Sequence, residues 1–142
     1  MNILFMCVAN SARSQMAQGL AVQTLPKHYH IQSAGSQPSG RVHPMALQYL
    51  QENQIDVSTF SSKGISDLPP DFLKNLDFVI SLCAEEVCPN ILSLAKKIRW
   101  SFPDPAKKGV LDNIEDFRAV GEGIRKRLMQ FANENPTVPS SR

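Results

Sequence analysis

The chain has 142 residues, of which 42% are hydrophobic and 20% charged, as is typical of one globular domain rather than a disordered chain. Fifteen Lys and Arg against thirteen Asp and Glu give a formal charge of +2 without a long basic run, which argues against a nucleic-acid partner. No apolar stretch reaches the ~18 residues of a membrane helix, and the N-terminus lacks the basic and apolar regions of a secretory signal, so we expect a cytoplasmic protein with no membrane partner.

Short apolar runs alternate with segments of helical spacing along the chain. The apolar runs predict four strands, at residues 2–7, 28–33, 77–82 and 98–102. Hydrophobic residues three or four positions apart predict helices at residues 16–25, 44–52, 70–75 and 114–131. The Ser-, Gly- and Pro-rich residues 56–70 predict a loop. His43 directly precedes the helix at residues 44–52, and we expect it to cap or line the start of that helix.

Strands that alternate with helices favour right-handed crossovers and a parallel sheet. We expect the α/β class: a single domain at residues 1–134 with a four-stranded parallel sheet and helices on both faces, followed by a flexible tail at 135–142. Ligands bind beyond the carboxyl ends of the strands in such sheets. Because Cys7, Cys83 and Asp104 each follow or end a predicted strand, we expect them to meet at one edge of the sheet.

The cysteines are Cys7, Cys83 and Cys88, and their odd number excludes a closed set of structural disulfides. In a reducing compartment such cysteines pack in the core, bind metal or carry out thiol chemistry. Cys83 and Cys88 offer two metal ligands, but the histidines supply no second pair, so we expect no metal site.

Eight residues join the first strand to the first helix, in the order Cys7-Val8-Ala9-Asn10-Ser11-Ala12-Arg13-Ser14. Backbone N–H groups in such a loop can point into one concavity, and the helix N-terminus adds partial positive charge. Arg13 can bind a tetrahedral oxyanion through two N–H groups, and Asn10 suits a left-handed turn position. The expected oxyanion-binding residues are Val8, Ala9, Asn10, Ser11, Ala12 and Arg13.

The same surroundings favour the thiolate form of Cys7, which is the nucleophilic form, and Ser14 can hydrogen-bond its sulfur. A buried cysteine followed by a surface arginine would show the same spacing without any chemistry. The position of the motif between a strand and a helix favours the oxyanion loop.

The segment FMCVANSARSQMAQG is similar to the anion loop of the low-molecular-weight protein tyrosine phosphatase fold, and most resembles the thioredoxin-coupled arsenate reductases of that fold. The resemblance covers about residues 2–131 and continues through Ser33-Ala34-Gly35, Ile55-Asp56-Val57-Ser58, Leu82-Cys83, Cys88-Pro89 and Trp100-Ser101-Phe102-Pro103-Asp104-Pro105-Ala106. The loop alone does not separate a reductase from a phosphatase, whereas the two later cysteines favour the reductase.

The resemblance implies a role for each cysteine. Cys7 would attack arsenate, Cys83 would attack Cys7 and release arsenite, and Cys88 would resolve the disulfide, although Cys88 follows Cys83 more closely than the six-residue spacer typical of the reductases. The implied electron donor is thioredoxin or a similar dithiol protein, and no metal or organic cofactor is required.

Asp104 is the candidate proton donor, since transfer to a thiolate requires a proton for the departing oxygen. Asp-Pro is also a common turn dipeptide, but the residues on both sides of it match the family. Phosphatases of this fold usually have Tyr after Asp-Pro, whereas this chain has Ala106, which opens the site to a small inorganic anion. The candidate catalytic residues are therefore Cys7, Arg13, Ser14, Cys83, Cys88 and Asp104.

Some reductases of this fold bind a structural potassium ion beneath the loop through Asn, Glu, Ser and Asp. Asn10 and Ser33 match this pattern, but Gln18 replaces the Glu and Lys63 falls near the Asp position. We therefore expect potassium to matter little.

Two other functions stay open at this point. A phosphatase of the same fold would share the first step but use water to release the intermediate from Cys7. A non-catalytic oxyanion or redox sensor would bind the anion or oxidise its thiols without turnover. The residues do not decide between arsenate and a phosphoester as substrate, and they leave the oligomeric state open.

Overall fold

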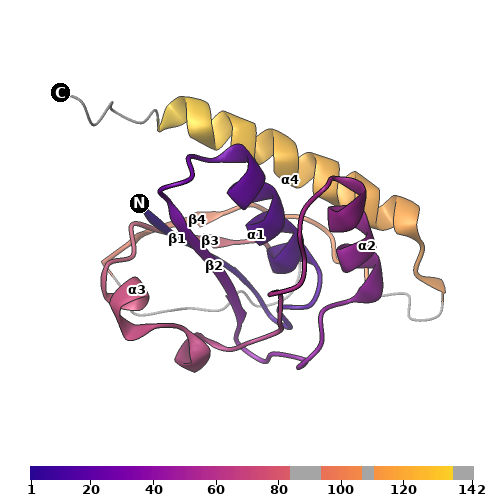
Figure 1. The fold of residues 1–142 in the computed structure, drawn as a ribbon, viewed down its shortest axis with the longest axis horizontal. Coiled ribbons are helices and arrows are strands. Elements are labelled where there is room, and N and C mark those ends of the chain that lie inside the picture. The colour runs from indigo at the N-terminus through magenta and orange to yellow at the C-terminus, as the bar shows by residue number, and fades with distance from the viewer. Residues whose placement is uncertain (84–93, 107–110, 136–142) are drawn as a thin grey trace.

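The computed structural model describes residues 1–83, 94–106 and 111–135, and its centre is a sheet of four parallel strands in the order β2-β1-β3-β4 (Figure 1). The strands are β1 (Asn2–Cys7), β2 (His30–Gly35), β3 (Phe78–Ser81) and β4 (Lys96–Arg99). The helices are α1 (Arg13–Thr24), α2 (Pro44–Glu52), the short 3-10 helix η1 (Ile65–Asp67), α3 (Pro70–Lys74) and α4 (Ile114–Glu134). The predicted α/β class and the parallel four-stranded sheet are confirmed.

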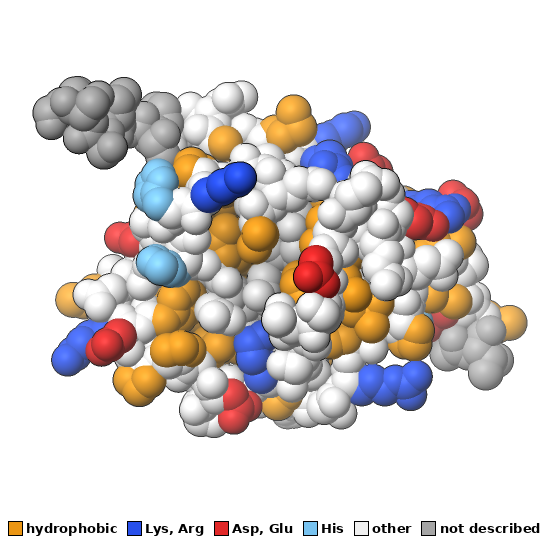
Figure 2. Space-filling view, viewed as in Figure 1, with side chains coloured by type: hydrophobic (Ala, Val, Ile, Leu, Met, Phe, Trp, Pro, Cys, Tyr) orange, Lys and Arg blue, Asp and Glu red, His pale blue; other side chains and the backbone are white. Residues whose placement is uncertain are grey.

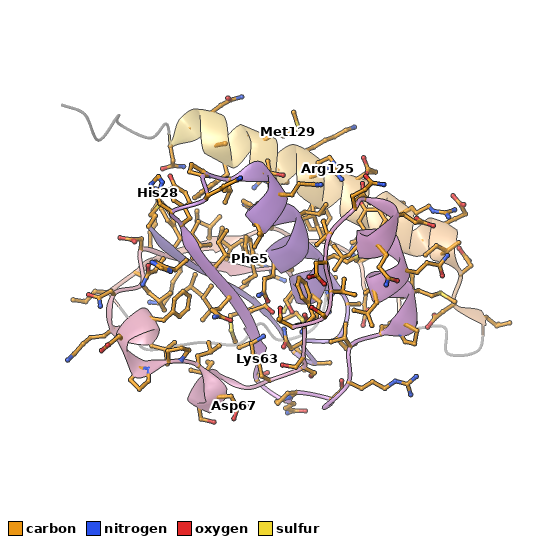
Figure 3. All side chains as sticks on the ribbon, in the orientation of Figure 1. Phe5, His28, Lys63, Asp67, Arg125 and Met129 are labelled. Atoms are coloured by element: carbon orange, nitrogen blue, oxygen red, sulfur yellow. The ribbon has the colours of Figure 1, made fainter. Side chains whose placement is uncertain are left out.

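Helices cover both faces of the sheet because the central strand β1 is apolar on both sides. Ile3 and Phe5 belong to the larger core, against α1, α2 and α4. Leu4 and Met6 face the other way and pack against residues around α3, including Phe72. Figure 3 shows Phe5 at the centre of the molecule. A strand buried on both faces explains why residues 2–7 are an unbroken apolar run.

The predicted fourth strand is present, but its predicted bounds, residues 98–102, are wrong: β4 runs from Lys96 to Arg99. It lies at the edge of the sheet, where Lys96 and Lys97 are exposed, so its pattern does not resemble a buried strand. After β4, the N–H of Trp100 still donates to the carbonyl of Ser81 at 2.8 Å.

Other boundaries differ by a few residues. The second strand begins at His30 rather than at residue 28, because the N–H of Tyr29 closes a turn onto the carbonyl of Pro26. The first helix already begins at Arg13, and the predicted loop at residues 56–70 contains η1. Residues 136–142 lie outside the described residues, so the predicted tail stays a prediction.

Charged side chains of both signs are scattered in small groups over the face seen in Figure 2, in keeping with the balanced composition. No helix among the described residues is long and apolar enough to cross a membrane.

Candidate active site

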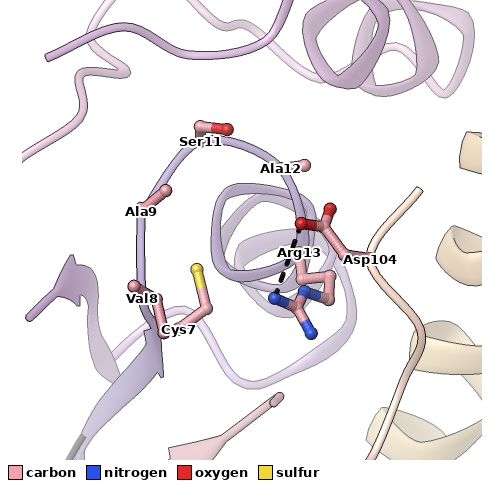
Figure 4. A pocket seen from close by; sticks show the side chains of 7 residues that line it. All are labelled: Cys7, Val8, Ala9, Ser11, Ala12, Arg13 and Asp104. Carbon is pink, nitrogen blue, oxygen red and sulfur yellow. Dashed lines mark ion pairs between the residues drawn. The ribbon is translucent and has the colours of Figure 1, made fainter. Parts of the chain in front are cut away.

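The anion loop, residues 7–13, curves from the end of β1 to the start of α1 around a cavity of about 200 Å³. Figure 4 shows the sulfur of Cys7 turned toward the inside of this curve, with Arg13 and Asp104 across from it. The residues that line the cavity are Cys7, Val8, Ala9, Ser11, Ala12, Arg13 and Asp104. The sheet and its loops therefore bring together residues nearly 100 positions apart in the sequence.

The carbonyl groups of the anion loop are held from outside the loop. Backbone N–H groups donate from Gln37 to Val8 at 2.9 Å, from Ser39 to Ala9 at 3.0 Å and from His43 to Ser11 at 2.8 Å. The hydroxyl of Ser62 also donates to the Ala9 carbonyl, at 3.0 Å. Because the N–H and C=O groups of a peptide unit point in opposite directions, carbonyls fixed outward leave N–H groups facing the cavity.

Cys7 is buried, and two hydrogen-bond donors reach its sulfur. The N–H of Asn10 donates to Sγ at 3.2 Å, and the hydroxyl of Ser14 lies 2.8 Å from Sγ. Ser14 Oγ also accepts a hydrogen bond from Asn10 Nδ2 at 2.7 Å, which leaves its hydrogen to point at the sulfur. Both donors stabilise a negative charge on Cys7.

Asn10 connects the loop to the structure beneath it. Its φ of 50° is left-handed, as its side-chain type predicts, and its side chain is fully buried. Its Oδ1 accepts from the N–H of Lys63 and from Nε2 of Gln15, each at 2.9 Å. Its Nδ2 donates to Ser33 Oγ at 3.0 Å as well as to Ser14. The orientation of the amide is thus fixed on every side.

Gly35, the last residue of β2, touches the back of the anion loop. A Cβ atom at this position would lie 2.4 Å from the carbonyl oxygen of Val8 and 3.0 Å from the nitrogen of Asn10. The loop can take its observed path only because this residue has no side chain.

Arg13 is buried and anchored on two backbone carbonyls. Its Nη1 donates to the carbonyl of Phe102 at 3.0 Å and to that of Leu82 at 3.4 Å. Its Nη2 lies 3.9 Å from Oδ2 of Asp104, while Oδ1 of Asp104 accepts the N–H of Ala106 at 3.0 Å. The guanidinium and the carboxyl group therefore occupy fixed positions at one wall of the cavity.

Cys83 lies two residues after Ser81, the last residue of β3, and next to the Leu82 carbonyl that Arg13 holds. It is fully buried. It is not among the residues that line the cavity. Cys88 lies outside the described residues, as do the two lysines at 107 and 108.

Several residues of the site were not predicted. The sequence indicated that His43 caps or lines a helix start, and its Nδ1 does accept the N–H of Met45 at the start of α2, at 3.1 Å. It did not indicate that the His43 backbone holds Ser11, or that Nε2 of His43 lies 3.3 Å from Oδ2 of Asp112. The supporting roles of Gln15 and Ser62 were missed as well.

The residues beneath the loop do not fit a potassium ion. Gln18 Oε1 already accepts the Ser33 hydroxyl at 2.6 Å, and Asn10 Oδ1 already accepts two N–H groups. Nζ of Lys63 donates to the carbonyl of Ser61 at 3.3 Å, a carbonyl that also accepts Nε2 of Gln15 at 2.8 Å, and partial burial lowers the pKa of this lysine. Figure 3 shows Lys63 beside the ends of the strands. No group of three or more His, Cys, Asp or Glu side chains suited to a metal occurs in the described part of the chain.

The profile of the low molecular weight phosphotyrosine protein phosphatases matches residues 2–137. The chain belongs to this family. It is 37% identical to arsenate reductase 1 of Staphylococcus haemolyticus over 131 residues, which are 91% of this chain and 92% of that protein. The resemblance found in the sequence is thereby confirmed.

Two solved structures are similar to this chain as well. An arsenate reductase in its phosphate-binding state is 29% identical, with a TM-score of 0.74 over 93% of this chain and 96% of that one. A thioredoxin-dependent arsenate reductase of Corynebacterium glutamicum is 28% identical, with a TM-score of 0.69 over 93% of this chain and 60% of that one.

Proposed function

We propose that this protein reduces arsenate to arsenite, with thiols as the source of electrons. The observation that carries the proposal is the cavity itself, where a buried cysteine with two donors on its sulfur faces an anchored arginine and a carboxyl group. The relatives named as arsenate reductases support arsenate as the oxyanion.

In the first step the Cys7 thiolate attacks the arsenic of arsenate bound in the anion loop. The loop N–H groups and Arg13 hold the oxygens, which carry the negative charge. One As–O bond breaks, and Asp104 supplies the proton with which this oxygen leaves as water. The product is an adduct in which Sγ of Cys7 is bonded to As(V).

In the second step Cys83 provides the other thiol. Its thiolate attacks Sγ of Cys7, so an S–S bond forms, the S–As bond breaks and the electron pair goes to arsenic, which leaves as arsenite. Two thiols have then become one disulfide, and this matches the two electrons that As(V) accepts. Cys83 is suited to the step because β3 and β1 are neighbours, so their ends lie side by side.

Two further steps belong to the proposal. Cys88 attacks Cys83, which frees Cys7, and a dithiol protein of the thioredoxin type then reduces the Cys83–Cys88 disulfide. The thioredoxin-dependent relative supports this donor. Such a donor is kept reduced in the cytoplasm, so we place the protein there.

A phosphatase is the second candidate, because the cavity has every group needed to transfer a phosphoryl group to Cys7, and Cys83 is not among its lining residues. Water would then release the intermediate. Family membership fits this alternative too.

The deciding experiment measures arsenite formation with thioredoxin, thioredoxin reductase and NADPH, and aryl phosphate hydrolysis in the same preparation. We expect arsenite formation, and we expect Cys83→Ser to abolish it. Aryl phosphate hydrolysis that persists in Cys83→Ser, with no arsenite from the parent protein, would refute the reductase and support the phosphatase.

A further inference from the structure

Arg99 and Cys83 lie on neighbouring strands at the same end of the sheet. The register of β3 and β4 pairs Arg99 with Ser81, which is two residues before Cys83. Since residues directly opposite each other in neighbouring strands have their side chains on the same face of a sheet, the side chain of Arg99 lies on the face that carries Ser81. Its Nε donates a hydrogen bond to the carbonyl oxygen of Cys83 at 3.1 Å.

This contact lies where the regular sheet ends. The carbonyl of Ser81 accepts the N–H of Trp100 at 2.8 Å, and the carbonyl of Leu82 accepts the N–H of Phe102 at a longer 3.3 Å. One residue further along, the Cys83 carbonyl receives a side-chain donor instead. Hydrogen bonds from a charged guanidinium are stronger than those between neutral groups, so Arg99 restrains the backbone of Cys83 beyond the end of the ladder.

We propose that Arg99 is a positioning residue for the second thiol step, and that it holds the backbone of Cys83 where its thiolate can attack Sγ of Cys7. The proposal rests on the proposed function, since only the reductase uses Cys83. In that step the Cys83–Cys7 bond forms, the Cys7–arsenic bond breaks, and arsenic takes the electron pair. In this proposal Arg99 acts on the step through the backbone of Cys83.

Two substitutions of Arg99 have similar lengths and differ in whether they keep the hydrogen-bond donor. In glutamine, Nε2 is separated from the backbone by the same number of bonds as Nε of arginine, so Arg99→Gln can keep the N–H donor while losing the charge. Arg99→Met has a similar length and no donor. Lys96→Met is the matched control, because it removes a cation from the same strand, on the face toward α4.

The step is isolated in the full chain carrying Cys88→Ser, in which the reaction stops at the Cys7–Cys83 disulfide. A single turnover with arsenate is followed by quenching, alkylation and mass mapping of the disulfide, together with arsenite release. We expect Arg99→Met to slow disulfide formation about tenfold, as the loss of one charge-assisted hydrogen bond implies. Arg99→Gln should stay within about threefold of the parent, and Lys96→Met should match it.

A second arm removes arsenate from the test. Diamide oxidises two neighbouring thiols to a disulfide and is itself reduced to the hydrazine, so its rate of Cys7–Cys83 formation reports the position of Cys83 directly. We expect Arg99→Met to form the disulfide most slowly with diamide, and Arg99→Gln and Lys96→Met to stay near the rate of the parent. A parent protein that forms the disulfide with diamide but not with arsenate would refute the proposed function while still measuring the effect of Arg99.

The rate of Cys7 alkylation, and its protection by phosphate, reports the anion loop and should be the same in all Arg99 variants. The proposal is overturned if Arg99→Met reacts with diamide as fast as the parent, or if Arg99→Gln is as slow as Arg99→Met. It is also overturned if the parent forms no Cys7–Cys83 disulfide with diamide. The same holds if Arg99→Met slows the alkylation of Cys7 as much as it slows disulfide formation.

Discussion

Replacing Gly35 with alanine tests whether the anion loop is held as tightly as its contacts indicate. The added Cβ would lie 2.4 Å from the carbonyl oxygen of Val8. A close C···O contact is about 3.3 Å, so the two atoms must separate by roughly 0.9 Å. The Val8 oxygen cannot simply rotate away, because it accepts the N–H of Gln37 at 2.9 Å.

The expected cost follows from this displacement. Overpacking against backbone costs about 2–3 kcal/mol, which lowers the melting temperature of a chain of this length by roughly 6–10 °C. A shift of about 1 Å in a group that positions substrate costs on the order of 100-fold in rate. Gly35→Ala should therefore lose both stability and most of its arsenate reduction.

Calorimetry and the coupled arsenite assay measure the two effects. Gly64→Ala is the matched control: Gly64 forms the bridge with Gly35, but its nearest neighbour to an added Cβ is 3.6 Å away, which is ordinary contact. It should behave like the parent protein. If Gly35→Ala keeps its melting temperature and turnover, the loop is not held by the contacts described, and the argument for a rigid anion site is wrong.

Three further expectations follow from single contacts. Ser14→Ala removes the hydroxyl 2.8 Å from Cys7 Sγ, and alkylation of Cys7 at neutral pH should slow about tenfold, whereas an unchanged rate would show that the contact does not stabilise the thiolate. Because Gln18 Oε1 and Asn10 Oδ1 already accept hydrogen bonds, melting temperatures in sodium and potassium buffers of matched ionic strength should agree, and a potassium-specific rise of several degrees would contradict this. Burial, and then the hydrogen bond to Glu122, raise the pKa of Tyr49 to about 12 from 10.0, so protonated Tyr49 stabilises the fold below pH 10 and this contribution is lost as the pH rises toward 12. Urea unfolding of Tyr49→Phe should show a weaker decline over that range, and a decline equal to that of the parent would contradict the assignment.

The parts of the site that could be predicted carry local signals. Residues 2–7 are apolar because β1 is buried on both faces, and the polar residues after them mark the loop. Asn10 has a side chain that tolerates the left-handed conformation it adopts. His43 precedes a proline at a helix start, which indicated its capping role. In each case the residue type and its immediate neighbours determine the structure.

The parts that could not be predicted depend on contacts between distant backbone groups. Gln37 and Ser39 hold the anion loop through their N–H groups, which every residue except proline has, so no side-chain pattern marks them. Arg99 has the sequence context of a solvated cation on an edge strand, and its bond to Cys83 depends on the register of β3 and β4. That register follows from the packing of the whole sheet.

The two halves of the proposed reaction place opposite demands on the fold. Attack by Cys7 requires a loop that does not move, and Gly35 together with the backbone donors around it supplies one. The thiol steps that follow require Cys83 to attack Cys7 and afterwards to reach another thiol. Cys83 lies past the last residue of β3, where a side chain of β4 holds its carbonyl. Such a bond can break and form again without opening the strand ladder. Substitutions at Gly35 should therefore impair every step, whereas those at Arg99 should impair the disulfide step and leave anion binding intact.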